Sequence, residues 1–229
     1  MELDDYVQQA IIFFQKGKLE QAIENFEAAL KINPNNEQIK QLYNNCKQMI
    51  SFKEQQCQSL TNEAKQRADV IGIELRDVDK IIIEYTENLK QNINDASLKG
   101  YLAKVYYIRG LLFCSKMDYK SSINDFNEAI NNQPDYIFAF NKRGWAYLEI
   151  ENFDMAIKDF KNILLYKPDD AQSKNKLADA YFKRGIDFDR KGDKEHAISD
   201  FETALKYNPD DKNTREILQM VNTHVNKNN

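Results

Sequence analysis

Histidine, cysteine, proline and tryptophan are all scarce in this chain of 229 residues, which has two histidines, three cysteines, four prolines and one tryptophan. His196 lies in a polar turn and His224 near the C-terminus, and neither has a nucleophile at a recognisable spacing. The cysteines lack the paired spacing of a metal site. We therefore expect no catalytic residues, no metal, no cofactor and no enzyme activity.

Long apolar runs and an excess of basic residues are missing as well. The apolar runs, such as residues 11–14, are far shorter than the ~20 residues that span a bilayer, and no charged-then-apolar leader is visible. The net charge is −4, with 30% charged residues of both signs, which argues against a basic face for nucleic acid. We expect a cytoplasmic protein without membrane insertion and without a nucleic-acid partner.

What the sequence does contain is a spacing of apolar, small and aromatic residues that recurs every 34 residues. In residues 137–170 this spacing is carried by Phe140, Gly144, Tyr147, Ala156, Phe160 and Pro168. Matching sets occur in residues 3–36, 103–136 and 178–211. Proline at the end of each set cannot continue a helix, so each set reads as two helices followed by a stop.

This pattern resembles the tetratricopeptide repeat, a unit of two antiparallel helices. Small residues at the eighth and twentieth positions let the paired helices approach, and the aromatic residue at position 24 fills the gap to the next pair. The resemblance implies an all-α, right-handed superhelical solenoid of helix–turn–helix repeats. An inserted long helix and a C-terminal capping helix complete the predicted fold, because the last repeat otherwise exposes its apolar side.

The spacing divides the chain into six segments. A shift of 75 residues superposes residues 94–110 on 169–185, and in both places the first helix of a repeat is predicted to begin seven residues early. We expect a first repeat (1–36), a long helix with a degenerate repeat (37–95), a repeat with an extended first helix (96–136), a repeat (137–170), another repeat with an extended first helix (171–211), and a capping helix with a frayed tail (212–229).

The long helix, predicted for residues 37–75, has two interpretations. Its apolar residues follow a seven-residue spacing, but Lys53 and Arg67 occupy positions in the same seam, so any coiled coil would be weak. One interpretation is a repeat helix packed on its neighbours. The other is a self-association helix, which would make the protein a homodimer.

The resemblance also implies a concave groove lined by the first helix of each repeat. The groove-facing positions, carried over to this sequence, predict a partner-binding surface formed by Tyr107, Leu111, Phe138, Asn141, Trp145, Phe182 and Ile186. A contiguous apolar surface of this kind marks a contact, either with a peptide or amphipathic helix of a partner or with a helix of the chain itself. Trp145 is the predicted anchor, since tryptophan often dominates interface energetics.

A chaperone carboxylate clamp, known in some members of this family, is not expected. Its first pair of positions would be Val7 and Ile11, or Tyr107 and Leu111, and these pairs cannot bind a carboxylate. The predicted function is therefore a non-enzymatic scaffold or adaptor for a protein partner of unknown identity. The alternative is a self-assembling structural protein that dimerises through residues 37–75 or through the apolar groove.

Arginine recurs at the seventh position of three repeats, as Arg109, Arg143 and Arg184. We expect a structural role for these residues, in which the long stem covers apolar surface and the guanidinium reaches a neighbouring acid. The alternative is ligand binding, because arginine is enriched at recognition surfaces.

Overall fold

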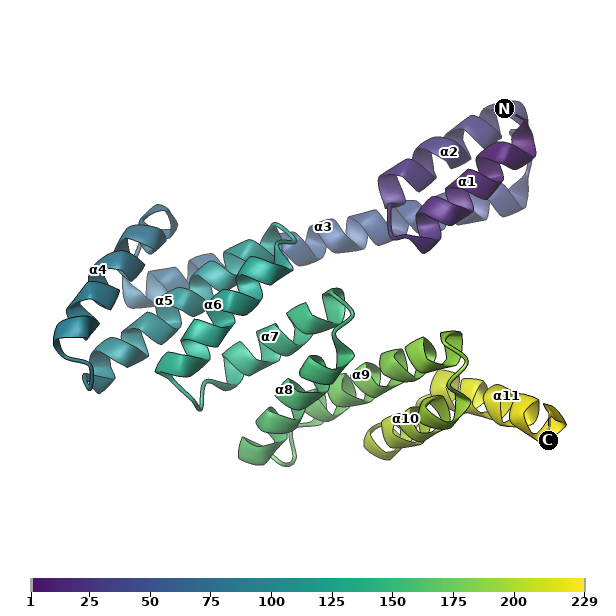
Figure 1. Cartoon of the computed structure of the whole chain (residues 1–229). Helices are drawn as coiled ribbons and strands as arrows, with labels where there is room; N and C mark the ends of the chain where they lie inside the picture. Colours follow the sequence, from purple (N-terminus) through teal and green to yellow (C-terminus); the bar gives the residue numbers. More distant parts are fainter. Residues whose placement is uncertain (1, 229) are drawn as a thin grey trace. The chain divides into compact units, whose positions relative to one another are not determined.

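The computed structural model describes residues 2–228, with side chains up to Thr223, and it is built from α-helices and one short 3-10 helix in this range. The predicted all-α repeat fold with a long helix and a C-terminal helix is confirmed. The chain divides into two compact units, one ending at Ser59 and the other beginning at Leu60 (Figure 1). Within the described residues, no helix is both long enough and apolar enough to span a lipid bilayer.

The first unit contains α1 (Leu3–Gln15), α2 (Leu19–Ile32) and the first part of α3 (Glu37–Ile71). Gly17 lies in the turn between α1 and α2 with φ +70°, a left-handed conformation that glycine adopts without steric cost. The small residues of α1 and α2 meet at the centre of the unit, where the core consists of Ala10, Ala22, Phe26, Ala29, Ile39 and Cys46. The first unit is thus one helix pair closed by the start of α3.

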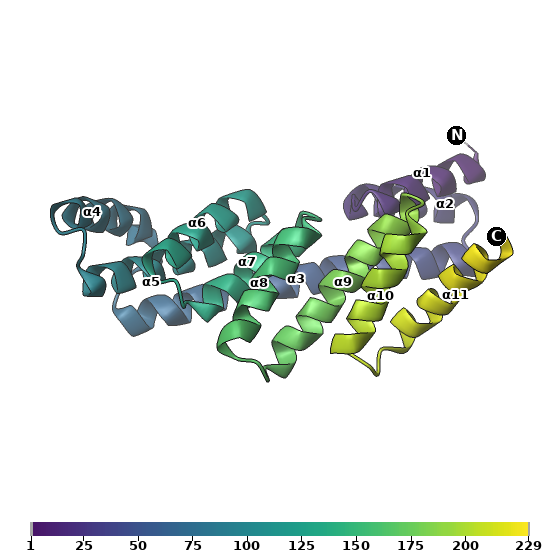
Figure 2. The same cartoon turned by 60° about the horizontal axis from the view of Figure 1, so that its bottom comes forward.

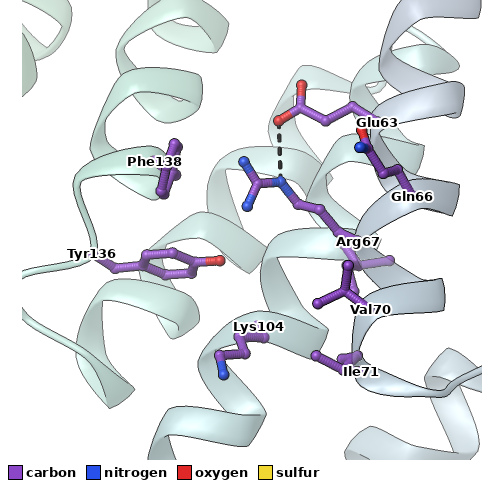
Figure 3. Close-up of a pocket in the computed structure, with 9 residues that line it drawn as sticks. Glu63, Gln66, Arg67, Val70, Ile71, Lys104, Tyr136 and Phe138 are labelled. Atoms are coloured by element: carbon purple, nitrogen blue, oxygen red, sulfur yellow. Dashed lines mark hydrogen bonds and ion pairs between the residues drawn. The ribbon is translucent and has the colours of Figure 1, made fainter.

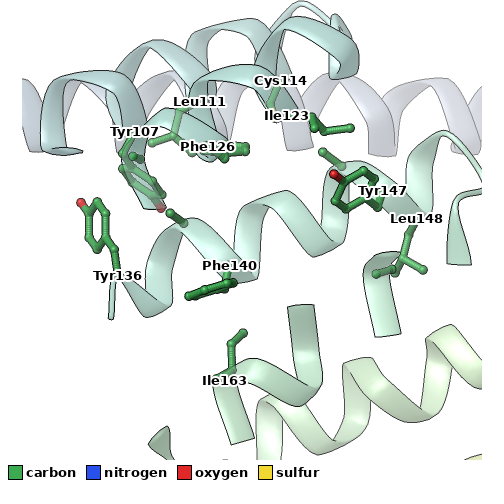
Figure 4. Packing of buried hydrophobic residues seen from close by; sticks show 14 of the residues in the cluster. Tyr107, Leu111, Cys114, Ile123, Phe126, Tyr136, Phe140, Tyr147, Leu148 and Ile163 are labelled. Atoms are coloured by element: carbon green, nitrogen blue, oxygen red, sulfur yellow. The ribbon is translucent and has the colours of Figure 1, made fainter. Parts of the chain in front are cut away.

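The second unit contains the end of α3 and all later helices. These are the 3-10 helix η1 (Leu75–Asp77), α4 (Val78–Gln91), α5 (Ala96–Ser115), α6 (Tyr119–Asn132), α7 (Ile137–Glu149), α8 (Phe153–Tyr166), α9 (Ala171–Arg190), α10 (Lys194–Tyr207) and α11 (Lys212–Asn228). Figures 1 and 2 show α5 with α6, α7 with α8 and α9 with α10 as adjacent helix pairs. One continuous core, part of which is drawn in Figure 4, joins these pairs to the end of α3.

Glycine is needed where the two helices of a pair approach most closely. A Cβ atom on Gly144 would lie 2.9 Å from Cε1 of Phe160, and a Cβ on Gly110 would lie 2.6 Å from Cε1 of Phe126. Since Cβ atoms are essentially never found under 3.0 Å from another heavy atom, a larger residue would force the ring to move. In the repeats that have glycine at this position, the aromatic residue therefore packs against the glycine of its own repeat, a contact that the spacing did not predict.

The recurring arginines hold the helices of a pair together, as their predicted structural role requires. Arg143 of α7 donates two hydrogen bonds to Asp159 of α8, from Nε (2.8 Å) and Nη2 (2.6 Å). Arg109 binds Asp125 in the same bidentate way, and Arg184 binds Asp200. Burial raises the pKa of Asp159 above its usual value, although the hydrogen bonds and charge of Arg143 act to lower it.

The apolar seam of α3 packs inside the chain along both ends of the helix. Ile39 and Cys46 are buried in the first unit, and Leu60 and Ala64 in the second. These contacts support the interpretation of α3 as a packed repeat helix.

The last helix, α11, covers the end of the second unit. Val221 is buried with Ala197 and Phe201 of α10, and Ile217 packs partly against the same cluster, as a capping helix requires. The helix is traced to Asn228, while the side chains of residues 224–228 and the whole of residue 229 lie outside the described part of the chain. The predicted fraying of this tail therefore stays a prediction.

Candidate functional site

The predicted groove residues fall into three groups by exposure. Tyr107 and Leu111 are fully buried, Phe138 is 54% exposed, and the other four are half-buried, namely Asn141, Trp145, Phe182 and Ile186. The expectation that Tyr107 and Leu111 present an open surface is corrected by this burial. Their partner-binding role, and that of the other five, stays a prediction.

The end of α3 is what buries Tyr107 and Leu111. The Tyr107 hydroxyl donates a hydrogen bond to Glu63 Oε1 (2.8 Å), and the guanidinium of Arg67 stacks 4.9 Å from the centre of the Tyr107 ring. Leu111 belongs to the same core cluster as Leu60 and Ala64 of α3. Part of the predicted groove is therefore covered by a helix of the chain itself, one of the two occupants that the sequence left open.

Glu63 is the polar centre of this contact. Its Oε2 atom pairs with Nζ of Lys142 on α7 at 2.7 Å, and its Oε1 accepts from Tyr107 on α5. Burial acts to raise the pKa of Glu63, but the hydrogen bond and charge of Lys142, with help from Tyr107 and Arg67, hold that pKa below its usual value. Burial and the nearby Glu63 carboxylate also raise the pKa of Tyr107 far above its usual value. Glu63 thereby links α3, α5 and α7 as an ionised carboxylate at neutral pH.

A cavity of about 580 Å³ opens beside this contact, and Figure 3 shows its lining. We call it the aromatic pocket. Tyr136 and Phe138 lie on one side of the view, and Arg67 extends toward them from α3 on the other side. The guanidinium of Arg67 lies 4.5 Å from the centre of the Phe138 ring, a cation–π contact. The complete lining is Glu63, Gln66, Arg67, Val70, Ile71, Lys104, Ile108, Tyr136 and Phe138.

A second cavity of about 350 Å³ extends from the same helices to the start of α9. We call it the lysine pocket. Lys176 lies in its wall, and its Nζ donates a hydrogen bond to Oδ1 of Asn141 (2.6 Å). Burial lowers the pKa of Lys176, and the charge of Lys142 lowers it further. The lining also includes Glu63, Arg67, Tyr107, Ile137, Phe138, Ile163, Lys167, Asp170, Gln172 and Ser173.

The remaining predicted residues are partly engaged in the fold. The Trp145 ring meets Tyr119 of α6 edge-on, with 5.6 Å between ring centres, and Phe182 lies 5.8 Å from Phe201. Ile186 packs partly against the cluster that holds Phe201. Trp145 and Phe182 thus have a structural role beside any role in binding, whereas Phe138 is the most exposed of the seven.

Sequence reasoning missed Glu63, Arg67, Lys142 and Lys176. A signal for Glu63 was available, because the 75-residue shift aligns it with Phe138, one of the predicted groove residues. Lys176 precedes the repeat that begins at residue 178, so the repeat positions alone could not select it.

No cluster of three or more His, Cys, Asp or Glu side chains that could hold a metal occurs among the residues described here. His196, the described histidine, is an exposed residue of α10 paired with Asp193, the residue that caps this helix. What the site presents is ring faces, a cavity and paired charges.

Comparisons with known proteins identify repeats in three segments. A family profile described as "TPR repeat" matches residues 11–39, and profiles described as "Tetratricopeptide repeat" match residues 141–187 and 178–211. A search of curated proteins finds no match.

Several solved structures are similar over much of the chain. The crystal structure of MamA protein has 20% identity and a TM-score of 0.40, covering 90% of this chain and 91% of its own. The TPR2AB domain of yeast Sti1, in complex with pHSP90, has 14% identity and a TM-score of 0.39, with 96% of each chain covered. The Arabidopsis OM64 TPR domain has 22% identity and a TM-score of 0.39, covering 55% of this chain and 98% of its own.

Proposed function

Since this chain is a tetratricopeptide repeat protein, we propose that it is a non-enzymatic scaffold or adaptor that binds a segment of a partner protein. The observation that carries the proposal is Phe138, which is 54% exposed on α7 beside the aromatic pocket. The binding face continues along Asn141, Trp145, Phe182 and Ile186. A cytoplasmic location and the division of the chain into the six segments given above belong to the same proposal.

An amphipathic helix or an apolar peptide suits this face. An exposed ring next to a cavity offers a place for one apolar anchor, and further anchors of a helix recur every three or four residues. Tyr107 and Leu111 take no part while the end of α3 covers them. The proposed face therefore begins at Phe138 and runs toward α9.

The test compares the wild-type chain with Phe138→Ala as baits for partner capture from native lysate. Phe138 is a better probe than Trp145, because Phe138 is 54% exposed whereas Trp145 is half-buried against Tyr119. Leu165→Ala serves as the matched control, since Leu165 is 79% exposed on α8 and lines neither pocket described above.

We expect one partner to be lost with Phe138→Ala and kept with Leu165→Ala. With that partner purified, Phe138→Ala should weaken binding by about 2 kcal/mol, the scale of an interface hot spot. Recovery of the same proteins by all three baits would contradict the proposed face.

Self-assembly is the second candidate, and it is favoured by two apolar residues of α3 in the first unit. Met49 is 43% exposed and Phe52 is 65% exposed, whereas much of the remaining seam of α3 is buried inside the chain. Size-exclusion chromatography with light scattering decides this point. A mass that stays at one chain over a wide concentration range excludes the dimer, and a dimer that Phe52→Lys dissociates supports it.

A further inference from the structure

We propose that the aromatic pocket binds a phosphoryl group on a side chain of the partner segment, with Arg67, Lys104 and Tyr136 as its ligands. The site rests on the proposed function, because that segment is the one bound along Phe138, and Phe138 lines the same pocket. It adds the chemical class of the partner, which is a phosphorylated protein.

The guanidinium of Arg67 is held in place while its terminal N–H groups stay unused. It lies 4.5 Å from the centre of the Phe138 ring and 4.9 Å from the centre of the Tyr107 ring. Its Nε atom donates a hydrogen bond to Oε1 of Glu63 at 3.3 Å. The two terminal amino groups form no hydrogen bond among residues 2–223. They are free to bind phosphoryl oxygens, for which a guanidinium has matching geometry.

Tyr136 supplies a buried hydroxyl group without a partner. The residue is 9% exposed, and its hydroxyl forms no hydrogen bond within the part of the chain that the structure describes. Buried hydroxyl groups almost always have a partner. Burial raises the pKa of Tyr136, so this hydroxyl keeps its proton and can donate. In Figure 3 it points into the pocket, between the guanidinium of Arg67 and the side chain of Lys104.

Lys104 adds a positive charge that no acid of the chain compensates. It is an exposed residue of α5 in the wall of the pocket, and it forms no ion pair within 4 Å among the described residues. Glu63, the acidic residue of the lining, is bound by Lys142 at 2.7 Å and by Tyr107 at 2.8 Å. The pocket therefore carries an excess of positive charge in a chain whose net charge is −4.

A phosphoryl group matches these three ligands better than a carboxylate does. A phosphorylated side chain has three acceptor oxygens and a charge of about −1.5 to −2 at pH 7, which balances both Arg67 and Lys104. A carboxylate offers two oxygens and a single charge. The cavity of about 580 Å³ also has the size of a small-ligand pocket, so it has room for an aromatic ring that carries the phosphoryl group beside Phe138.

The equivalent position in the second half of the unit has the opposite charge. The 75-residue shift aligns Lys104 with Asp179 and Tyr136 with Asp211. Two carboxylates there would repel a phosphoryl group. The site is therefore confined to the aromatic pocket and does not recur along the groove.

The test measures fluorescence anisotropy of four labelled pentapeptide amides with the full chain. They share the sequence Gly-Ala-X-Ala-Gly, where X is phosphotyrosine, phosphoserine, tyrosine or glutamate. Both phosphopeptides should bind at least about tenfold more tightly than the other two, because only they carry the phosphoryl group. Tighter binding of phosphotyrosine than of phosphoserine assigns the cavity to the ring.

Inorganic phosphate, added as a competitor, separates the two sources of a phosphoryl group. It should displace the phosphotyrosine peptide only at concentrations well above that peptide's dissociation constant, because it lacks a side chain that can pack on Phe138. Equal affinities of inorganic phosphate and the phosphopeptides would overturn the assignment to a protein side chain.

Lys104→Gln and Tyr136→Phe should each weaken binding of the phosphotyrosine peptide about tenfold, the equivalent of about 1.4 kcal/mol. Neither group has a hydrogen-bond partner or an ion pair in the folded chain, so both variants should keep their helices, which circular dichroism checks. The matched controls are Lys99→Gln, on the same helix as Lys104, and Tyr166→Phe, at a tyrosine that is 51% exposed. Both control residues lie outside the pocket lining, and each change should alter binding by less than about twofold.

Three results with the peptides would overturn the phosphoryl site. The first is equal binding of the tyrosine and phosphotyrosine peptides, and the second is equal binding of the glutamate peptide and the phosphopeptides. The third is an equal loss of binding for each variant and its matched control.

Partner capture from native lysate, with and without phosphatase treatment, separates this site from the proposed function. If Phe138→Ala loses a partner that the wild-type chain recovers from treated and untreated lysate alike, the scaffold proposal stands and the phosphoryl site falls. If phosphatase treatment or Lys104→Gln removes the partner while Phe138→Ala keeps it, the phosphoryl site stands and the apolar face falls.

Discussion

Replacement of Arg143 by glutamine should destabilise the second unit more than the same change at either equivalent arginine. Asp159 is completely buried and accepts both of its bidentate hydrogen bonds from Arg143. Arg143→Gln leaves this carboxylate without its hydrogen-bonded cation. Loss of one partner from a buried ion pair typically costs about 3–5 kcal/mol, a large share of the ~5–15 kcal/mol that stabilises a domain.

Protonation of Asp159 sets an upper limit to this loss. Bringing a carboxyl group with an ordinary pKa of 3.8 into its neutral form costs about 4 kcal/mol at pH 7 and about 2 kcal/mol at pH 5. In the variant the folded state binds this proton more tightly than the unfolded state does. Its stability relative to wild type should therefore recover as the pH falls from 7 to about 5.

Urea denaturation followed by Trp145 fluorescence measures this effect, because Trp145 is the single tryptophan of the chain and lies on α7, the helix that carries Arg143. Arg109→Gln and Arg184→Gln are the matched controls. The side chains of these arginines are 26% and 24% exposed, against 12% for Arg143, so we expect smaller losses.

The double variant Arg143→Met with Asp159→Leu tests the cause. It removes both charges and keeps apolar volume, and it should regain most of the stability that Arg143→Gln loses. A loss that does not change with pH, or a double variant as unstable as the single one, would refute the reasoning from a buried charge.

Three further changes probe the packing, the Glu63 contact and the turns. Gly144→Ala should lower the free energy of unfolding by about 1–3 kcal/mol through overpacking. The control is Gly100→Ala, which should raise this free energy by about 0.5–1 kcal/mol, because a Cβ at Gly100 meets no atom within 4 Å. Equal effects of the two changes in denaturant titrations would contradict the close helix approach at Gly144. Glu63 has a lowered pKa, so its charge stabilises the fold above its ordinary pKa of 4.5, and this contribution is lost as the pH falls. Glu63→Gln should therefore be less stable than wild type at pH 7 and should lose less stability than wild type toward about pH 3. If the stabilities of the two proteins fall in parallel with pH, the Lys142 contact is excluded as the cause. Glu151 is an exposed residue with φ 59°. Glu151→Gly should raise the melting temperature, because glycine adopts this left-handed conformation without strain. A lower melting temperature would contradict the backbone strain at Glu151.

The helical repeats could be predicted because their determinants are local in sequence. Gly144, Phe160 and Pro168 each carry a constraint that holds wherever two helices pack with this spacing: close approach, a filling ring and a stop. The arginines at the seventh position could be assigned a structural role for the same reason, because a long stem beside the packing glycine covers apolar surface and lets the guanidinium reach a neighbouring acid.

The candidate site depended on contacts between segments that the sequence does not place together. Tyr107 occupies a groove position by its spacing, yet it is buried because Glu63 and Arg67, at the end of a helix 35 residues long, lie over it. Spacing within one repeat says which side of a helix a residue occupies. It does not say whether another helix covers that side.

The sequence by itself determined the helix pairs, the early starts of two first helices and the polar pairing of the arginines, because each follows from periodicity and side-chain chemistry over a few turns. The tertiary structure alone decided which groove residues are exposed. It also decided that Glu63 forms its ion pair with Lys142, while Lys176 donates its hydrogen bond to Asn141. Burial and ion pairing of this kind depend on distances between atoms from α3, α5, α7 and α9, and these distances exist only once the helices have packed.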